Sequence, residues 1–381
     1  MSMPAAARVL LATLFALAGT VAAGTQGQPV LGAGCTVMIP RSVDRVDPER
    51  EEFRRIGPGA VVCLPAGKRG NIKLFNLRGT AEQPIVVRNS GGPVTISGTE
   101  FGDGGIIIAA SSFLRLTGTG TDKDCGADHT PRAQRCGIII DGAKKGVKIV
   151  TSKGDVHDLE IDHVAVERVS QEVKTRGILM HPLPGQLISG IHIHHNFVTN
   201  TLAEGIYMGS EPHDQPFDSL AKLERVEIDH NLVMNVGFDG IKIKVAIADV
   251  AVHHNVIRNA GISRTPAHQG GIKVAMSVGD FYNNTVIGAV EGIRANRELE
   301  SPETRYFNNL VIDVIDVGIE ASEDGAQIYN NMVVMSSGAG IRARGEGALV
   351  VDNVVIEASD PIDMRRGQVG ENIIVAAGRI Q

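Results

Sequence analysis

The sequence predicts an all-β solenoid in which short parallel strands stack coil upon coil. Two recurring motifs support this fold class. A Gly-Ile-x-hydrophobic segment occurs seven times at separations of 21 to 35 residues, and an Asn-x-hydrophobic segment follows each copy. Each segment alternates apolar and polar residues over about five positions, which is the period of a strand with one buried face. A repeat this short, built only from strands, buries its apolar face by coiling against its neighbours.

The two motifs predict what each coil contributes to the core. The first begins at Gly177, Gly205, Gly240, Gly271, Gly292, Gly318 and Gly340, and the second places Asn196, Asn231, Asn255, Asn284, Asn309, Asn331 and Asn353. Like positions of successive coils stack about 4.8 Å apart. Inward Ile and Val then form apolar stacks, and the Asn side chains form a ladder at a bend. We also expect structural roles for the histidines beside this ladder, namely His194, His195, His230, His253 and His254.

The first 23 residues have the pattern of a secretory signal. Arg8 precedes an apolar core that ends near Leu17, and small residues follow up to Ala23. We expect cleavage before Gly24 and a secreted or periplasmic protein. The alternative is a membrane anchor, although the apolar run is shorter than the roughly 20 residues that a span requires. We expect no membrane span in the rest of the chain.

The four cysteines fit an exported protein, because an even count in an oxidising compartment favours disulfides. We expect Cys35 to pair with Cys63 beside the first turn, and Cys125 with Cys136 across a polar loop. Three pairings are formally possible. Metal binding is the alternative, although neither pair has the close spacing of zinc ligands.

Composition limits the classes of partner. The formal net charge of -6 gives no general attraction to nucleic acid, so any anion site must be local. The 45 glycines and the absence of tryptophan suit many tight turns around an aliphatic core. We expect a monomer.

The mature chain is predicted to be a single domain with a cap. Residues 24–60 contain the charged stretch DRVDPEREEFRR, which we expect to form a short helix over the open end of the first coil. Residues 61–381 are predicted to form the solenoid, because turn-rich strand segments continue without a linker to the end of the chain.

These motifs resemble those of the right-handed parallel β-helix proteins of the pectate-lyase-like superfamily, whose coils alternate a Gly-Ile strand with an Asn-x-Val strand. The resemblance covers roughly 300 residues and implies the fold. It does not select one activity, because lyases, epimerases, glycoside hydrolases, tail spikes and adhesins share this fold.

The residue after each repeated Ile, and the residue two positions later, are predicted to face solvent, because side chains alternate across a strand. This outward column contains Leu179, Tyr207, Lys242, Lys273, Arg294, Glu320 and Arg342, and a second column two residues later contains His181, Gly209, Lys244, Ala275, Asn296, Ser322 and Arg344. The lysines and Arg294 predict a positive stripe across three coils, which requires a compensating anion such as an acidic polysaccharide. The alternative is a set of solvated side chains relieved by Asp239, Glu291 and Glu320.

Three long loops are predicted to wall this stripe on both sides. They read HPLPGQLIS, EPHDQPFDSLAKLER and NAGISRTPAHQG, and they are longer than the turns at equivalent points of other coils. Long loops on a compact scaffold usually serve function.

Proton abstraction beside a uronate carboxylate needs a base, a group that neutralises the carboxylate, and an acid near the leaving oxygen. The candidate catalytic residues are Tyr207, His213, Lys242, Lys244 and Lys273. Candidate substrate-binding residues are His181, His268, Arg294 and Arg342. Asp214, Asp218 and Asp239 are candidate ligands for Ca²⁺, because calcium prefers oxygen ligands.

Two finer resemblances suggest different reactions. The sequence EPHD at 211–214 is similar to the DPHD element of mannuronan C5-epimerases with this fold, which implies a base role for His213. GIKIK followed by GIKVAM is similar to the alginate lyase and chondroitinase B family, which implies Lys242 or Lys244 as the base. Here Lys273 stands where that family has Arg, and the family's Asn-Gly-Gly-Glu calcium element is absent.

The function predicted from the sequence is a secreted lyase that cleaves an acidic, uronate-containing polysaccharide by β-elimination. Two alternatives stay open: C5 epimerisation of a uronate polymer, and a non-catalytic polysaccharide-binding or surface protein.

Overall fold

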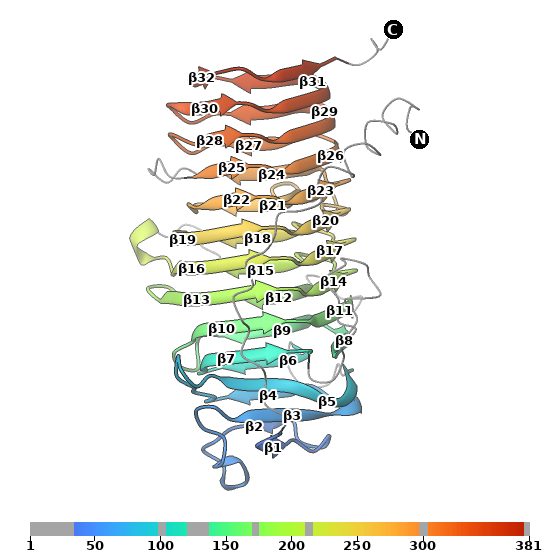
Figure 1. Cartoon of the computed structure of the whole chain (residues 1–381), viewed down its shortest axis with the longest axis vertical. Helices are drawn as coiled ribbons and strands as arrows, with labels where there is room; N and C mark the ends of the chain where they lie inside the picture. The colour runs from blue at the N-terminus through green and yellow to red at the C-terminus, as the bar shows by residue number, and fades with distance from the viewer. Residues whose placement is uncertain are drawn as a thin grey trace.

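The computed structural model describes residues 34–97, 104–119, 137–169, 175–209, 216–296 and 304–376. Figure 1 shows these residues as a tall stack of coils with the N-terminal coils at one end and the C-terminal coils at the other. Every strand pairing in this part of the chain is parallel, as shown by the registers of β15 with β18 and of β18 with β21. The fold is a right-handed parallel β-helix, as the sequence predicts.

Three sheets form the faces of the coil. The first, called here the Gly-Ile sheet, contains β2 (Arg45–Val46), β4 (Ile72–Phe75), β6 (Ile106–Ala109), β9 (Lys145–Val150), β12 (Arg176–Met180), β15 (Ile206–Gly209), β18 (Ile241–Lys244), β21 (Gly270–Ala275), β24 (Glu291–Asn296) and β27 (Ile319–Ala321). Their pairings run in order along the stack.

The strands of the second face, called here the histidine sheet, end shortly before the repeated asparagine in the sequence. It contains β1 (Val37–Met38), β7 (Ser112–Thr117), β10 (His157–Asp162), β13 (Leu187–His194), β16 (Lys222–Asp229), β19 (Ala246–His253), β22 (Asp280–Tyr282), β25 (Arg305–Phe307), β28 (Gln327–Tyr329), β30 (Ala348–Val351) and β32 (Gly367–Val369).

The third face follows the asparagine. It contains β8 (Ile138–Ala143), β11 (Val164–Val169), β14 (Phe197–Thr199), β17 (Leu232–Met234), β20 (Val256–Arg258), β23 (Thr285–Ile287), β26 (Leu310–Val314) and β33 (Ile373–Val375). Four long strands bend across two faces: β3 (Val61–Arg69), β5 (Ile85–Ile96), β29 (Met332–Ala343) and β31 (Val354–Met364).

The aliphatic core runs the length of the coil. Ile206, Ile241 and Ile272 are fully buried and occupy the same inward position of successive coils. The glycine before each of these isoleucines is required because the backbones of neighbouring coils approach closely there. A Cβ on Gly240 would lie 2.5 Å from the carbonyl oxygen of Gly271. A side chain there would push neighbouring coils apart, which explains why the motif keeps glycine.

The asparagine ladder predicted from the sequence is present. Asn255 Nδ2 donates to Asn284 Oδ1 at 3.0 Å and to the carbonyl oxygen of Ile228 at 2.8 Å. The same bonds join Asn196, Asn231, Asn255, Asn284, Asn309, Asn331, Asn353 and Asn372 in sequence. Buried amides are therefore satisfied along the whole bend.

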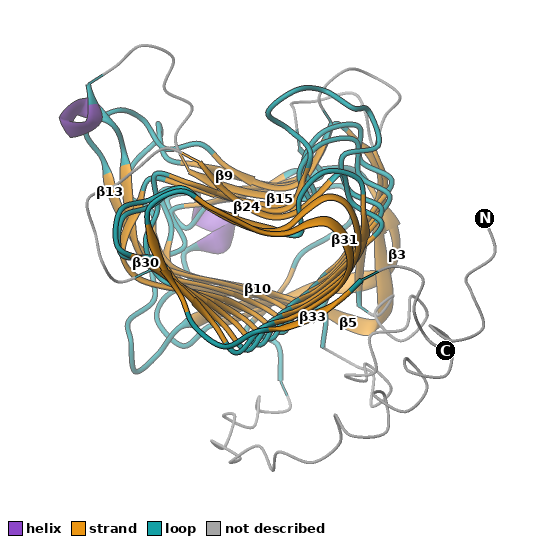
Figure 2. Ribbon diagram, turned by 90° about the horizontal axis from the view of Figure 1, so that it is seen from above, coloured by secondary structure: helices purple, strands orange, loops and turns teal. Residues whose placement is uncertain are grey.

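The N-terminal end is covered by the charged stretch. The short 3-10 helix η1 (Glu51–Phe53) lies across the open coil, where Figure 2 shows it in purple at the centre, and Phe53 is buried in the core. Strands β1 and β2 of the first coil lie within the segment predicted as a cap. Cys35 and Cys63 form the predicted disulfide. Cys125, Cys136 and the leader at 1–23 lie outside the described residues.

Within the described ranges, no helix combines the length and the apolar character needed to span a bilayer.

Candidate active site

The outward column of the Gly-Ile sheet has the register predicted from the sequence. Tyr207 pairs with Lys242, Lys242 with Lys273, and Lys273 with Arg294. Loops stand on both sides of this sheet around β15 and β24 in Figure 2. One wall carries the 3-10 helix η2 (Phe217–Ser219), and the Ser219 carbonyl accepts a hydrogen bond from Gly185 at 2.9 Å.

A second column lies beside the first, and the sequence pointed to two of its residues, Asp239 and Glu291, but not to the others. The column consists of the residue that precedes each repeated glycine, namely Arg176, Glu204, Asp239, Gly270 and Glu291. A signal for Arg176 and Glu204 was available, because four of these five positions carry a charged residue while the equivalent residues of later coils are Val317 and Ala339.

Glu204 is the centre of the charge network. It is fully buried, accepts a hydrogen bond from Arg176 Nε at 2.6 Å, and lies 3.5 Å from Lys242 Nζ. Burial alone would raise its pKa, but Arg176 and Lys242 outweigh burial and hold the pKa of Glu204 below its usual range. Glu204 is therefore ionised and fixes Lys242 in place.

Asp239 and His268 complete one side of this network. Asp239 is fully buried, and its Oδ1 accepts a hydrogen bond from the Gly270 amide at 2.8 Å. Its Oδ2 lies 3.7 Å from His268 Nδ1, which lies equally far from Glu204 Oε1. The His268 ring stacks on Phe238 with centroids 4.8 Å apart. The long loop before β21 thus brings His268 to the carboxylates.

Tyr207 lies beneath this network. Lys242 Nζ is 4.5 Å from the centre of its ring, and the Arg176 guanidinium is 5.7 Å from it. His181 packs edge-on against the ring with centroids 4.6 Å apart. The expectation that these outward residues face solvent is wrong, because Tyr207 is 0% exposed, Lys242 6% and Lys273 2%.

Lys273 occupies the next coil. Burial lowers its pKa, with Arg294 and Lys242 acting in the same direction and Asp239 and Glu291 opposing them. Its Nζ has no hydrogen-bond partner among the described residues. Burial also raises the pKa of Glu291, which accepts a hydrogen bond from Arg294. Lys273 therefore reaches its neutral form more easily than an ordinary lysine.

Unsatisfied polar atoms are concentrated in this cluster. Among the described residues, five buried side-chain atoms without a hydrogen-bond partner lie here: Asp239 Oδ2, His268 Nδ1, Lys273 Nζ, Glu291 Oε2 and Arg294 Nε. Each such atom costs roughly 1–3 kcal/mol unless water or a ligand contacts it. Such a concentration is typical of a site that binds a polar ligand.

The stripe predicted to be positive is compensated by the protein itself. Arg294 Nε lies 3.4 Å from Glu320, and Arg342 Nε donates to Asp363 at 3.0 Å. With Glu204 and Asp239 beside Lys242, the column does not require an external anion for charge balance. Asp239, Glu291 and Glu320 therefore offset the positive charge of this column, as the alternative prediction stated.

Lys244 belongs to the second outward column. Its side chain is partly buried, and it pairs in register with Gly209.

The carboxylates could hold a metal ion, since Glu204, Asp239 and His268 present ligand atoms within 4.8 Å of one another. They do not fit calcium. Calcium takes six to eight oxygen ligands, whereas Lys242 Nζ already lies 3.5 Å from Glu204 and 4.0 Å from Asp239. Asp218 is exposed in η2 and belongs to no such group among the described residues. His213 and Asp214 lie outside the described residues.

Comparison with solved structures agrees with this fold. The chain is similar to a lacto-N-biosidase from Eubacterium ramulus (TM-score 0.55, 15% identity) over 84% of this chain and 62% of that chain, so it spans less than two thirds of that protein. It is similar to an alginate lyase from Paenibacillus sp. (TM-score 0.54, 18% identity) over 82% of this chain and 93% of that chain. No family model and no curated protein matches the sequence. The resemblance noted from the motifs is thus confirmed for the fold.

Proposed function

We propose that this chain is a polysaccharide lyase that cleaves a uronate-containing polysaccharide by β-elimination over Tyr207, Lys242 and Lys273. The observation that carries the proposal is the buried amino group of Lys273, which lacks a hydrogen-bond partner among the described residues and has a lowered pKa. A perturbed lysine beside a fixed cation and a tyrosine is the set of groups that this elimination needs.

The three residues lie on three successive strands, in the order Tyr207, Lys242, Lys273. Neighbouring strands are about 4.8 Å apart, so a sugar ring centred over Lys242 has Tyr207 on one side and Lys273 on the other. Lys242 then faces the uronate carboxylate. The base and the acid lie on either side of the bond that breaks.

The proposed reaction assigns one task to each residue. Neutral Lys273 takes the proton from C5 of the uronate, and the electron pair forms the C4–C5 double bond as the bond from C4 to O4 breaks. The Tyr207 hydroxyl donates its proton to O4 of the leaving sugar. Lys242, held by Glu204 at 3.5 Å, stabilises the negative charge that develops on the carboxylate. A proton transfer from Lys273 to Tyr207 restores the starting state.

Entry of the glycan is proposed to occur beside His268. The three reacting side chains are buried, whereas the His268 side chain is 34% exposed and that of Arg294 is 27% exposed. A sugar that contacts Asp239 Oδ2 and Lys273 Nζ would supply the partners that these atoms lack. His181, Arg294 and Arg342 are proposed to contact neighbouring sugars, and Lys244 is retained as a further contact on β18.

The proteins with similar folds support a carbohydrate substrate, because one is named as a lacto-N-biosidase and the other as an alginate lyase. Alginate is therefore the first polymer to test. We also propose that the mature chain is secreted or periplasmic, which agrees with the disulfide between Cys35 and Cys63.

The test is incubation of the mature protein with alginate, pectate and glycosaminoglycans while the ultraviolet absorbance of the unsaturated product is followed. We expect absorbance to rise with at least one polymer for the wild type and for a Lys153→Ala control on an exposed turn. Absence of product from every polymer, with and without calcium, would contradict the proposal. In that case NMR of the recovered polymer detects C5 epimerisation, and retention on immobilised polymer detects binding alone.

A further inference from the structure

Acidic and imidazole side chains alternate along the outer face of the histidine sheet. One column contains Glu160, His192, Glu227 and Ala251, and the column two residues later contains Asp162, His194, Asp229, His253 and Tyr282. Both columns follow from the sequence, because the coils read EIDH, HIHH, EIDH and AVHH in turn. Each histidine therefore has carboxylates on the coils beside it.

Part of this pattern is structural, as the sequence analysis expected. The rings of His163, His195, His230 and His254 stack along the bend with centroids 4.9 to 5.2 Å apart and nearly parallel planes. His192 and His194 lie on the outer face of β13 and are not members of this stack. His194, for which the sequence predicts a structural role, is buried and contacts the His195 ring edge-on with centroids 5.1 Å apart.

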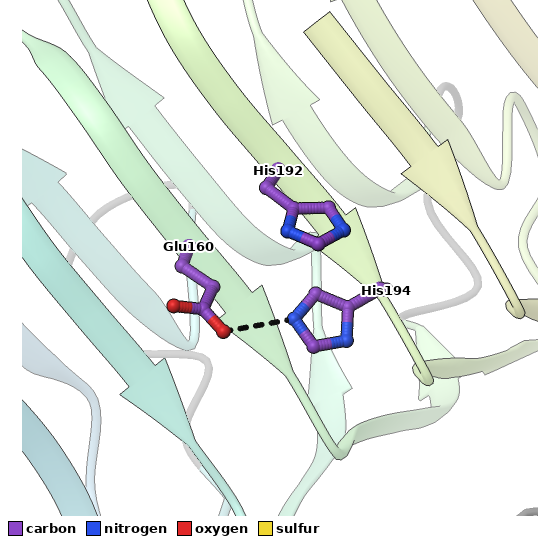
Figure 3. Close-up of side chains that lie close together, drawn as sticks. All are labelled: Glu160, His192 and His194. Carbon is purple, nitrogen blue, oxygen red and sulfur yellow. Dashed lines mark hydrogen bonds and ion pairs between the residues drawn. The ribbon is translucent and has the colours of Figure 1, made fainter. Parts of the chain in front are cut away.

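Three of these side chains converge on one point. Glu160 pairs in register with His192, and His194 follows two residues later on the same face of β13. In Figure 3 the Glu160 carboxylate and both rings lie together, and Glu160 Oε1 is 3.0 Å from His194 Nε2. The two rings have centroids 4.0 Å apart, and the three ligand atoms lie within 4.8 Å of one another.

We propose that Glu160, His192 and His194 bind a divalent transition-metal ion, with Zn²⁺ as the best fit. Two imidazoles and one carboxylate match the three protein ligands of an open zinc site, which keeps its fourth position for water or a ligand. Calcium is a poor match, because it requires oxygen ligands. This site is separate from the proposed lyase centre, since it lies on another face of the coil.

The surroundings of both histidines favour coordination. His192 Nε2 lies 2.6 Å from Asp229 Oδ1, which leaves its Nδ1 for the metal. His194 Nδ1 lies 2.8 Å from His195 Nδ1, which leaves its Nε2 on the side of Glu160. Metal-bound histidines usually donate their other ring N–H in this way, which fixes the tautomer and the ring orientation.

The local charge also suits a dication. Arg115 Nε lies 2.8 Å from Asp162 and 3.2 Å from Glu160, so one guanidinium faces two carboxylates. Together with Asp229, which lies 2.6 Å from His192, these side chains carry a formal net charge of −2, from one guanidinium and three carboxylates. A divalent cation would offset this charge.

A groove opens onto the proposed ion. Its volume is about 600 Å³, and its lining includes Arg115, Glu160, His192, Arg225 and Glu227. The Glu160 side chain is 34% exposed and that of His192 is 36% exposed, so an ion can reach them from solvent, whereas the His194 side chain is 5% exposed. The fourth coordination position then faces the groove.

The test uses the full mature chain freed of metal by chelator and then titrated with Zn²⁺ in a calorimeter. We expect one ion per chain, and we expect His192→Gln and His194→Gln each to weaken affinity roughly ten- to a hundredfold. His268→Gln is the matched control, because His268 belongs to the other histidine-containing group on the Gly-Ile sheet. Circular dichroism establishes that each variant is folded.

Failure of the wild type to bind Zn²⁺ would overturn the proposal. Loss of binding in His268→Gln with normal binding in His194→Gln would also overturn it and place the ion at Glu204 and Asp239. Glu227→Gln serves as a second control, because Glu227, Asp229 and His192 form a neighbouring group. Loss of affinity in Glu227→Gln without loss in His194→Gln would assign the ion to that group instead.

Discussion

Lys242 Nζ lies 4.5 Å from the centre of the Tyr207 ring on the neighbouring coil. The same nitrogen lies 3.5 Å from the buried carboxylate of Glu204. Lys242 is therefore held between an aromatic face and an ionised acid, in register with Lys273 on the next strand. This arrangement gives Tyr207, Lys242 and Lys273 different electrostatic surroundings, and separate roles follow from that difference.

Removal of the Tyr207 hydroxyl tests the role of general acid. Tyr207→Phe keeps the ring and its contact with Lys242, so the fold should persist. We expect the rate of product formation to fall about a hundredfold or more, which is the contribution of a positioned acid. Tyr282→Phe on the histidine sheet is the matched control and should retain activity. Full activity of Tyr207→Phe would remove the hydroxyl from the mechanism.

Arginine substitutions distinguish the base from the fixed cation. Arginine carries the charge but does not release its proton near neutral pH. Lys273→Arg should therefore be inactive across the pH range, while Lys242→Arg should keep a measurable fraction of wild-type activity. The opposite pattern would assign the base to Lys242.

The pH dependence of the wild type follows from the lowered pKa of Lys273. The base must be neutral, so activity should rise with pH as Lys273 loses its proton. Because its pKa lies below the ordinary lysine value of 10.5, this rise should occur at lower pH than for an unperturbed lysine. Rates measured from pH 6 to pH 10 provide the check. Activity that falls steadily with pH over this range would contradict a neutral amine base.

Calcium removal should leave activity unchanged. Lys242 occupies the position beside Glu204 and Asp239 where an oxygen-bound ion would have to lie. Activity measured after treatment with a calcium-selective chelator, and again after calcium is restored, gives the comparison. Loss of activity that calcium restores would show that the ion is required and that this charge network has been interpreted wrongly.

Glu323 should make the stability of the fold depend on pH. Burial raises its pKa to about 7, and its Oε1 accepts a hydrogen bond from Tyr306 at 3.0 Å. The folded chain keeps this proton between the ordinary value of 4.5 and about 7, whereas the unfolded chain releases it. Stability contributed by the group is therefore present below pH 4.5 and is lost as pH rises toward 7.

Glu323→Gln isolates this effect. The shift corresponds to about 3 kcal/mol at 1.36 kcal/mol per pKa unit. The free energy of unfolding should match that of the wild type near pH 4.5 and exceed it by up to about 3 kcal/mol at pH 8. Chemical denaturation at both values gives the difference. An equal difference at both pH values would mean that Glu323 does not titrate in this range.

The asparagine ladder should contribute strongly to stability. Asn255→Ala removes an amide that donates to the Ile228 carbonyl and to Asn284 Oδ1, and whose Oδ1 accepts from the backbone and side-chain nitrogens of Asn231. We expect the free energy of unfolding to fall by about 3 kcal/mol. Gln327→Ala, on the outer side of β28, should change it by less than about 0.5 kcal/mol. A loss of less than 1 kcal/mol in Asn255→Ala, roughly that of one ordinary hydrogen bond, would contradict the ladder's importance.

The repeat made the fold and the register predictable from the sequence. A strand has a period of two, so the outward positions of Tyr207, Lys242 and Lys273 follow directly once Ile206 is assigned to the core. The Asn ladder followed in the same way, because asparagine at a recurring bend can bond its equivalents above and below.

The electrostatics of the site were less predictable. Arg176 is the first residue of β12, and Glu204 lies just before the next strand of the sheet, where the strand period does not specify direction, so their 2.6 Å contact was not foreseen. Burial of Tyr207 depends on loops such as the one that carries His181, and loop paths are not determined by periodicity. The pattern of the coils identified the sheet, but tertiary contacts determine which cations are neutralised.

Mass spectrometry of the oligosaccharide products tests the central claim most directly. Wild-type protein and Lys273→Arg are incubated with the polymer that gives the strongest absorbance change, and the products are analysed without further treatment. We expect wild-type products that carry a C4–C5 double bond and are one water lighter than the products of hydrolysis, and we expect no product from Lys273→Arg. Saturated products of full hydrolytic mass, or unsaturated products formed equally well by Lys273→Arg, would contradict this claim.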